Sequence, residues 1–269
     1  MKAAILERLK KPLIVADVAL TDTLIAGQVR IRMLAAGVCG SQLHEIDGNR
    51  GEDKYLPHLL GHEGSGIVEE IGPNVTKVKK GDYVVISWIK GSGINAPGAV
   101  YSWGTKKVNS GSAAVFAEEI IASENRITKI SKNIPPDVAA LLGCAIPTGA
   151  GVVRNTLHIP KGSTIAIFGT GGVGASAIMG AVLMGAKEII AVDISPEKLK
   201  LAKKLGATMT IDASKKDPVA VIRKKYKDGL DYAVEAAGIT SVMEQAFASL
   251  SNTGTLSIAG HPKEGSKIS

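Results

Sequence analysis

The sequence contains 269 residues, of which 45% are apolar, enough for one large domain or two ordinary ones with packed cores. Its net charge of +7 comes from scattered lysine pairs and not from a basic stripe with interleaved aromatic residues, which argues against nucleic-acid binding. With two cysteines and no signal-peptide pattern at its start, the chain is expected to be cytoplasmic and reduced, without a structural disulfide.

Short segments of alternating polarity dominate the first half of the chain. They are bounded by Gly, Pro, Asn or Asp and read QVRIRML (28–34), GSGIVEEIG (64–72), KKGDYVVIS (79–87) and AEEIIAS (117–123). Alternation of this kind is typical of half-buried strands. The pattern predicts a β-rich, barrel-like domain over residues 1–147.

Strands and helices alternate in the second half. The predicted order is TIAIF, a helix through Met184, EIIAVD, a Lys-rich helix from Pro196 to Leu205, ATMTID, a helix around Pro218 to Tyr226, LDYAVEA, a helix to Leu250, and GTLSIAG. This order predicts an α/β domain over residues 148–269, with a doubly wound parallel sheet. A six-stranded dinucleotide-binding sheet needs one strand more, so we expect this Rossmann domain to be incomplete.

One stretch has the length of a membrane span. Residues 162–186 contain no charged side chain. The stretch opens with a β-branched run, breaks at GTGGVG and resumes with a helical pattern, which indicates strand, turn and helix. No membrane association is expected.

The glycine-rich turn is Gly169-Thr170-Gly171-Gly172-Val173-Gly174, and Asp193 ends the next predicted strand. A GxGxxG motif alone is weak, but here it lies between a strand and a helix, with an acidic residue about 20 positions further on. Backbone N–H groups of such a turn bind a pyrophosphate. The Asp193 carboxylate would accept from the ribose hydroxyls and repel a 2′-phosphate, which favours NAD over NADP. The alternative is a glycine-rich turn with a capping aspartate.

The two cysteines, Cys39 and Cys144, lie in short apolar stretches, and His62 precedes Glu63 in a glycine-flanked turn. Two thiolates and an imidazole are soft ligands that leave a fourth position open on zinc. A lone buried cysteine is more often a small hydrophobe, and the His-Glu pair also suits an ordinary tight turn. Composition alone therefore gives weak support to a zinc site.

Several stretches, in this order, resemble the zinc-containing medium-chain alcohol dehydrogenases of the medium-chain dehydrogenase/reductase superfamily. They are CGSQLH (39–44), GHEGSG (61–66), GPNVTKVKKGD, LLGCAIPTGAG, and GTGGVG followed by AVDIS. The resemblance covers essentially the whole chain. It implies a GroES-like catalytic domain before the Rossmann domain, and hydride transfer between an alcohol and NAD that gives an aldehyde or ketone.

The resemblance also implies roles for individual residues. By this similarity, Cys39, His62 and Cys144 match the ligands of the catalytic zinc, and Glu63 matches an acidic neighbour that can join the metal. Ser41 and His44 match a proton relay, and Thr148 matches a position at the nicotinamide. Val173 matches a residue packed on the ring side of the nicotinamide, and Lys198 matches a residue near the adenosine ribose.

The sequence departs from the family pattern at several places. The lobe of four cysteines that holds a structural zinc is missing, so one zinc is expected. Gln42 stands where many members carry an Asp that orients the histidine ligand, a change that can cost about 10–100-fold in metal affinity. Members are usually homo-oligomers that pair through the last strand, which is expected to be absent here. Two alternatives stay open: a zinc-free quinone or enoyl reductase of the superfamily, and an inactive NAD- and zinc-binding remnant.

Overall fold

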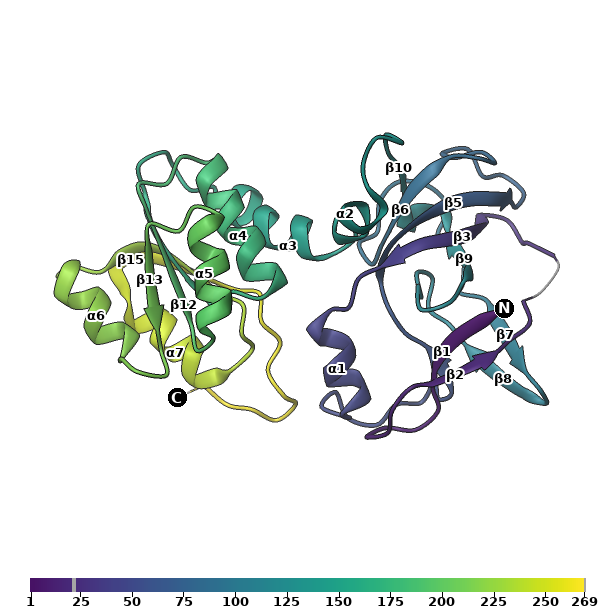
Figure 1. Cartoon of the computed structure of the whole chain (residues 1–269), viewed down its shortest axis with the longest axis horizontal. Helices are drawn as coiled ribbons and strands as arrows, with labels where there is room; N and C mark the ends of the chain where they lie inside the picture. Colours follow the sequence, from purple (N-terminus) through teal and green to yellow (C-terminus); the bar gives the residue numbers. More distant parts are fainter. Residues whose placement is uncertain (21–22, 269) are drawn as a thin grey trace. The chain divides into compact units, whose positions relative to one another are not determined.

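The computed structural model describes residues 1–20 and 23–268. The chain divides into two compact units, Met1–Cys144 and Ala145–Ser269. Each unit is described by itself (Figure 1).

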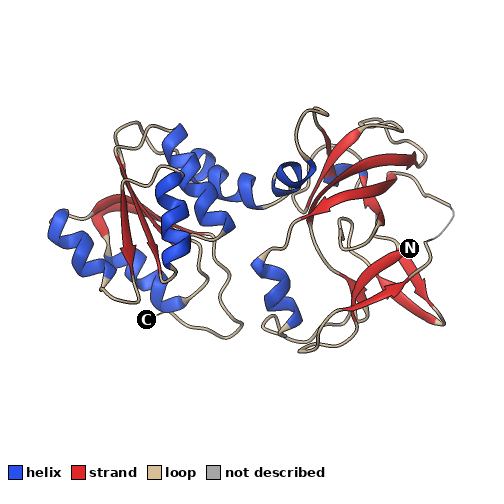
Figure 2. Ribbon diagram, viewed as in Figure 1, coloured by secondary structure: helices blue, strands red, loops and turns tan. Residues whose placement is uncertain are grey.

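The first unit is built of strands with few helices (Figure 2). One five-stranded sheet has the order β2-β1-β4-β8-β7, and a second has the order β10-β6-β5-β3-β9. The strands are β1 (Lys2–Leu6), β2 (Ile14–Asp17), β3 (Gln28–Ala36), β4 (His58–Leu59), β5 (Glu63–Ile71), β6 (Tyr83–Ser87), β7 (Val100–Trp103), β8 (Lys106–Asn109), β9 (Glu119–Ser123) and β10 (Ile127–Lys129). Helix α1 (Gly40–Ile46), the 3₁₀ turn η1 (Glu124–Arg126) and helix α2 (Pro136–Leu141) connect them.

Among the described residues of this unit, the strands pack around three apolar clusters. Val29 and Ile31 of β3 are fully buried in one cluster, together with Ile86 of β6. The antiparallel ladder between β3 and β5 shifts register twice, between Arg30 and Ile31 and between Met33 and Ala35. Such irregularities bend a strand and increase its twist, which helps a sheet to close on itself.

The second unit is a parallel sheet between two layers of helices (Figure 2). Its strands have the order β13-β12-β11-β14-β15, the doubly wound arrangement predicted from the sequence. They are β11 (Thr164–Phe168), β12 (Glu188–Asp193), β13 (Met209–Asp212), β14 (Leu230–Glu235) and β15 (Leu250–Ile258). The helices are α3 (Ala145–Gly151), the π-helical turn η2 (Val152–Thr156), α4 (Gly172–Leu183), α5 (Pro196–Lys204), α6 (Pro218–Lys225) and α7 (Thr240–Ala248).

The alternation along β11 explains the two layers. Ile165 and Ile167 are buried with side chains of α4 and α5 on one face. Ala166 and Phe168 are buried on the other face, with side chains of α6 and α7. Because both faces are covered, the strand is a continuous apolar run, as expected in a parallel sheet.

The fold predicted from the sequence is confirmed in its main elements. The uncharged stretch of residues 162–186 contains β11 and α4. Among the residues that the structure describes, no helix combines the length and apolarity needed to cross a membrane. The α3–η2 segment, which packs against α4, has no counterpart in the sequence prediction.

Candidate active site

Three side chains from distant parts of the first unit meet in one cluster. Cys39 is the N-cap of α1, His62 directly precedes β5, and Cys144 follows α2. Their sulfur and ring-nitrogen atoms all lie within 4.8 Å of one another. The structure thus brings together the three predicted zinc ligands, which are separated by up to about 100 positions in the sequence.

Two glycines make this meeting possible. Gly61 has φ of +89°, and a Cβ there would lie 2.6 Å from Val115 Cγ2. A Cβ on Gly143 would overlap the carbonyl oxygen of Ile86 and lie 2.8 Å from Glu63 Cα. Only glycine lets the chain pass so close at both points, and each lies one residue before a member of the cluster.

The chemistry of the cluster fits zinc. The Nε2 atom of His62 is buried and has no hydrogen-bond partner among the described residues. The pKa of the Cys39 thiol is lowered to about 3, first by its hydrogen bond with Cys144 and then by the adjacent His62 ring. A thiolate and a free ring nitrogen are the forms in which these side chains bind metal.

Gln42 connects two members of the cluster. Its side chain is almost fully buried, its Oε1 accepts from the backbone N–H of Cys39 at 2.7 Å, and its Nε2 lies 2.8 Å from His62 Nδ1. Gln42 therefore contacts Nδ1 of His62, the ring nitrogen other than the unpartnered Nε2, from the position at which many family members carry an Asp.

The remaining predicted residues of the first unit lie around the cluster. Glu63 is buried at the start of β5, next to His62 but outside the three-residue cluster. Ser41 and His44 are both in α1. The Ser41 hydroxyl oxygen lies 3.4 Å from Gln42 Nε2, and His44 Nδ1 lies 3.3 Å from Asn49 Nδ2.

The glycine-rich turn of the second unit has the geometry of a nucleotide site. A Cβ on Gly174 would overlap the carbonyl oxygen of Gly169, whereas a Cβ on Gly171 meets no described atom within 4 Å. Gly174 is therefore required for packing, and the open space at Gly171 fits close approach of a pyrophosphate to the N-terminus of α4. Gly172 and Val173 are the first residues of that helix.

Asp193 lies at the carboxyl end of β12, beside this turn. Its Oδ2 accepts from Thr170 N–H at 2.7 Å and from Thr170 Oγ1 at 3.1 Å, and its Oδ1 accepts from Ser195 N–H at 3.0 Å. The carboxylate thus holds the glycine-rich turn in place. Lys198 is exposed in the first turn of α5. Thr148 lies in α3, and its Oγ1 is buried without a described partner.

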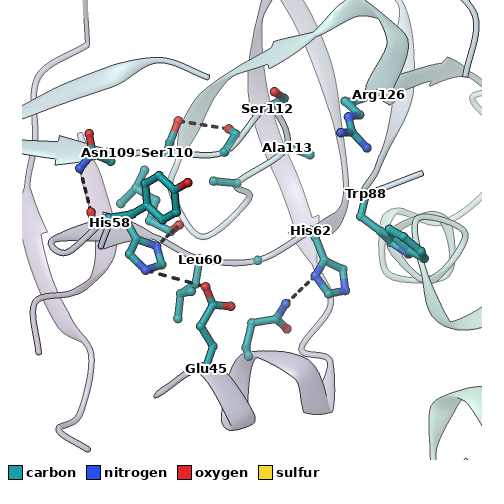
Figure 3. Close-up of a pocket in the computed structure, with 16 residues that line it drawn as sticks. Glu45, His58, Leu60, His62, Trp88, Asn109, Ser110, Ser112, Ala113 and Arg126 are labelled. Atoms are coloured by element: carbon teal, nitrogen blue, oxygen red, sulfur yellow. Dashed lines mark hydrogen bonds and ion pairs between the residues drawn. The ribbon is translucent and has the colours of Figure 1, made fainter. Parts of the chain in front are cut away.

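A cavity of about 380 Å³ lies beside the cluster in the first unit (Figure 3). Its wall includes His62 and Gln42, the rings of Trp88 and Tyr55, and apolar side chains such as Leu60. Sequence reasoning did not single out Arg126, which also lines it. The available signal was weak: Arg126 is one of two basic residues in the run ENRITKI, after a predicted strand.

A second group of titratable side chains, His58, Glu45 and Asp53, was not predicted either, and two of them, His58 and Glu45, line the same cavity. His58 Nε2 lies 2.7 Å from Asp53 Oδ2 and 3.8 Å from Glu45 Oε1. His58 Nδ1 lies 3.0 Å from the carbonyl oxygen of Leu59. The two imidazole nitrogens thus face a carbonyl oxygen on one side and two carboxylates on the other.

In a comparison with known proteins, both halves of the chain match domains of alcohol dehydrogenases. Residues 25–132 match the alcohol dehydrogenase GroES-like domain, and residues 172–269 match the zinc-binding dehydrogenase domain. Alcohol dehydrogenase class-3 of Myxine glutinosa is 34% identical over 275 residues, with 92% of this chain and 73% of that relative covered.

Solved structures agree. An alcohol dehydrogenase zinc-binding domain protein from Burkholderia ambifaria is 33% identical, with a TM-score of 0.90. Benzyl alcohol dehydrogenase from Acinetobacter calcoaceticus is 32% identical, with a TM-score of 0.89. Each similarity covers 100% of this chain and 79% of the other. The chain therefore belongs to the zinc-containing medium-chain alcohol dehydrogenase family.

Proposed function

We propose that this chain is an NAD-dependent zinc alcohol dehydrogenase, which transfers a hydride between a small primary or secondary alcohol and NAD to give an aldehyde or ketone. The cluster of Cys39, His62 and Cys144 within 4.8 Å carries the proposal. Cys39 and Cys144 are not joined in a disulfide, and thiols can bind a metal only while they stay reduced, which supports a cytoplasmic location.

Each cofactor has a place that its chemistry suits. Cys39, His62 and Cys144 would hold zinc, with Glu63 behind them. When bound, zinc supplies a Lewis acid that polarises an oxygen, and NAD supplies the hydride acceptor. The turn at Gly169–Gly174 would hold the pyrophosphate, and Asp193 would face the adenosine ribose.

Two residues of α1 are proposed to move the proton. Ser41 and His44 are three positions apart and therefore share a face of the helix. We assign Ser41 to accept the hydroxyl proton of the alcohol and His44 to pass it to solvent. We place Thr148 and Val173 at the nicotinamide, where the buried Thr148 hydroxyl without a described partner offers a hydrogen-bonding group, and Lys198 near the ribose.

An activity assay of the zinc-loaded chain tests the proposal. We expect NADH formation from benzyl alcohol or an aliphatic alcohol, and its loss in the Cys144→Ser variant. Bound zinc without turnover of any primary or secondary alcohol would favour the inactive remnant. Quinone reduction by NADPH that survives removal of zinc would favour the zinc-free reductase.

A further inference from the structure

Arg126 places a positive charge at the cavity that contains His62. It is the last residue of the turn η1, and Figure 3 shows its guanidinium at the same end of the cavity as Trp88. Arg126 forms no ion pair or hydrogen bond with the residues that the structure describes, and its Nε is buried without a partner. Burial lowers the pKa of this guanidinium, which nevertheless stays a cation at neutral pH.

The nearest acidic residue in the sequence is not available to Arg126. Glu124 lies two positions earlier, and its Oε1 accepts from the backbone N–H groups of Thr76 and Lys77 at 2.6 and 2.9 Å. Its Oε2 accepts from Ile94 N–H at 2.7 Å. Glu124 is thus bound to three backbone donors and holds the loops around η1 together.

The carboxylate that lines the cavity also has a nearby partner. Glu45 lies near His58, whose Nε2 is 3.8 Å from Glu45 Oε1. Figure 3 shows Glu45 and His58 at the end of the cavity opposite Arg126. The negative charge at that end lies near an imidazole, whereas the guanidinium at the other end forms no ion pair with an acid among the described residues.

We propose that Arg126 binds an anionic group of the substrate, so that the preferred alcohols carry a carboxylate or a phosphate monoester. This inference rests on the proposed function. A buried guanidinium nitrogen without a partner is costly, and an oxyanion satisfies it with short, charge-assisted hydrogen bonds. The apolar wall formed by Leu60 and Trp88 suits a hydrocarbon or aromatic body between the hydroxyl and the anionic group.

Alcohols that share a hydroxymethylphenyl body and carry a carboxylate, a phosphate or a neutral amide test the proposal. The zinc-loaded chain would be titrated calorimetrically, without NAD, with 4-(hydroxymethyl)benzoate, 4-(hydroxymethyl)benzamide and 4-(hydroxymethyl)phenyl phosphate. We expect the carboxylate or the phosphate to bind about 10- to 100-fold more tightly than the amide, the range expected for charge-assisted hydrogen bonds. The arm with the larger advantage identifies the anion. The same compounds would be compared as substrates by kcat/KM.

Three variants distinguish a direct contact between Arg126 and the anion from a general effect of positive charge on the protein. Arg126→Gln should abolish the preference, and Arg126→Lys should keep part of it because the charge remains. Lys107→Gln removes an exposed positive charge on β8 and should leave the preference unchanged. Zinc content and thermal unfolding of Arg126→Gln show whether the variant is folded. If it is not, the affinities of the wild-type chain for the three compounds and those of Arg126→Lys test the anion site.

The possible results distinguish this inference from the proposed function. Equal binding of the benzoate, the phosphate and the benzamide by the wild-type chain would overturn the anion site, even if benzyl alcohol is oxidised. An unchanged preference in folded Arg126→Gln would overturn it as well. Arg126-dependent binding of an anion without oxidation of any alcohol would support the site and contradict the dehydrogenase activity.

Discussion

Replacing Gln42 by Glu should strengthen zinc binding. In the structure, the amide oxygen of Gln42 faces Cys39 N–H and its nitrogen faces His62 Nδ1. When Nε2 of a neutral imidazole binds a metal, Nδ1 carries the proton and needs an acceptor. The Gln42 amide can then accept from Nδ1–H only with its oxygen. Its NH₂ group must in that case face Cys39 N–H, so that two donors face each other. A carboxylate accepts from both.

The magnitude follows from one buried hydrogen bond. Gln42 is 2% exposed, so water cannot satisfy the donor left without an acceptor. Such a donor costs about 1–3 kcal/mol, or about 5- to 150-fold in affinity. We expect Gln42→Glu to bind zinc about tenfold more tightly than the wild-type chain. Gln42→Leu, which offers the ring no acceptor, should bind it more weakly by a similar factor.

Competition with a chromophoric chelator measures these affinities on the metal-free chain. Gln28→Glu is the matched control, since Gln28 is also buried in the first unit and bonds to Ile25 N–H and Pro97 O. It should leave zinc affinity unchanged. Equal zinc affinity in the wild-type, Gln42→Glu and Gln42→Leu chains would refute the reasoning.

Three further outcomes are expected. Gly174→Ala forces a Cβ onto the carbonyl oxygen of Gly169 and should lower the melting temperature of the second unit by about 5–10 °C. Gly171→Ala should leave the melting temperature unchanged and weaken NAD binding, measured by calorimetry, by about tenfold. NAD affinity retained in Gly171→Ala would argue against a pyrophosphate there. NAD should bind more tightly than NADP, and Asp193→Gly should narrow this difference in affinity. Equal affinity of the wild-type chain for both cofactors would show that Asp193 does not lie at the ribose. Because the pKa of Cys39 is lowered to about 3, its thiolate persists above that pH. The rate at which Cys39 is alkylated in the metal-free chain should therefore change little between about pH 5 and 8. A rate that falls about tenfold for each pH unit of acidification, as for an ordinary thiol of pKa about 8.5, would contradict this.

Local patterns in the sequence were sufficient to predict the parallel sheet of the second unit and the helices between its strands, although not the α3–η2 segment. The apolar runs at residues 164–168 and 188–193 and the turn GTGGVG each depend on neighbours within a few positions. Strand–turn–helix order and right-handed crossovers then leave few topologies, and the doubly wound sheet is among them. Asp193 could be placed at the turn because the carboxyl ends of neighbouring parallel strands meet at one edge.

The site of the first unit could not be derived from spacing. Cys39 and Cys144 are brought together by an antiparallel ladder and two close backbone passages at Gly61 and Gly143, which have no local signature. Family resemblance, and not physical reasoning, supplied the ligand set before the structure showed the cluster. Arg126 stayed unnoticed because only the fold shows that Glu124, the acid closest to it in sequence, is bound elsewhere.

Metal analysis of three purified chains tests the central claim most directly. The wild-type chain should bind one zinc, Cys144→Ser should bind almost none, and His58→Gln should keep the full amount, because His58 belongs to the separate group with Glu45 and Asp53. Zinc retained in Cys144→Ser but lost in His58→Gln would place the metal in that second group. A stoichiometry near two would likewise contradict a single site formed by Cys39, His62 and Cys144.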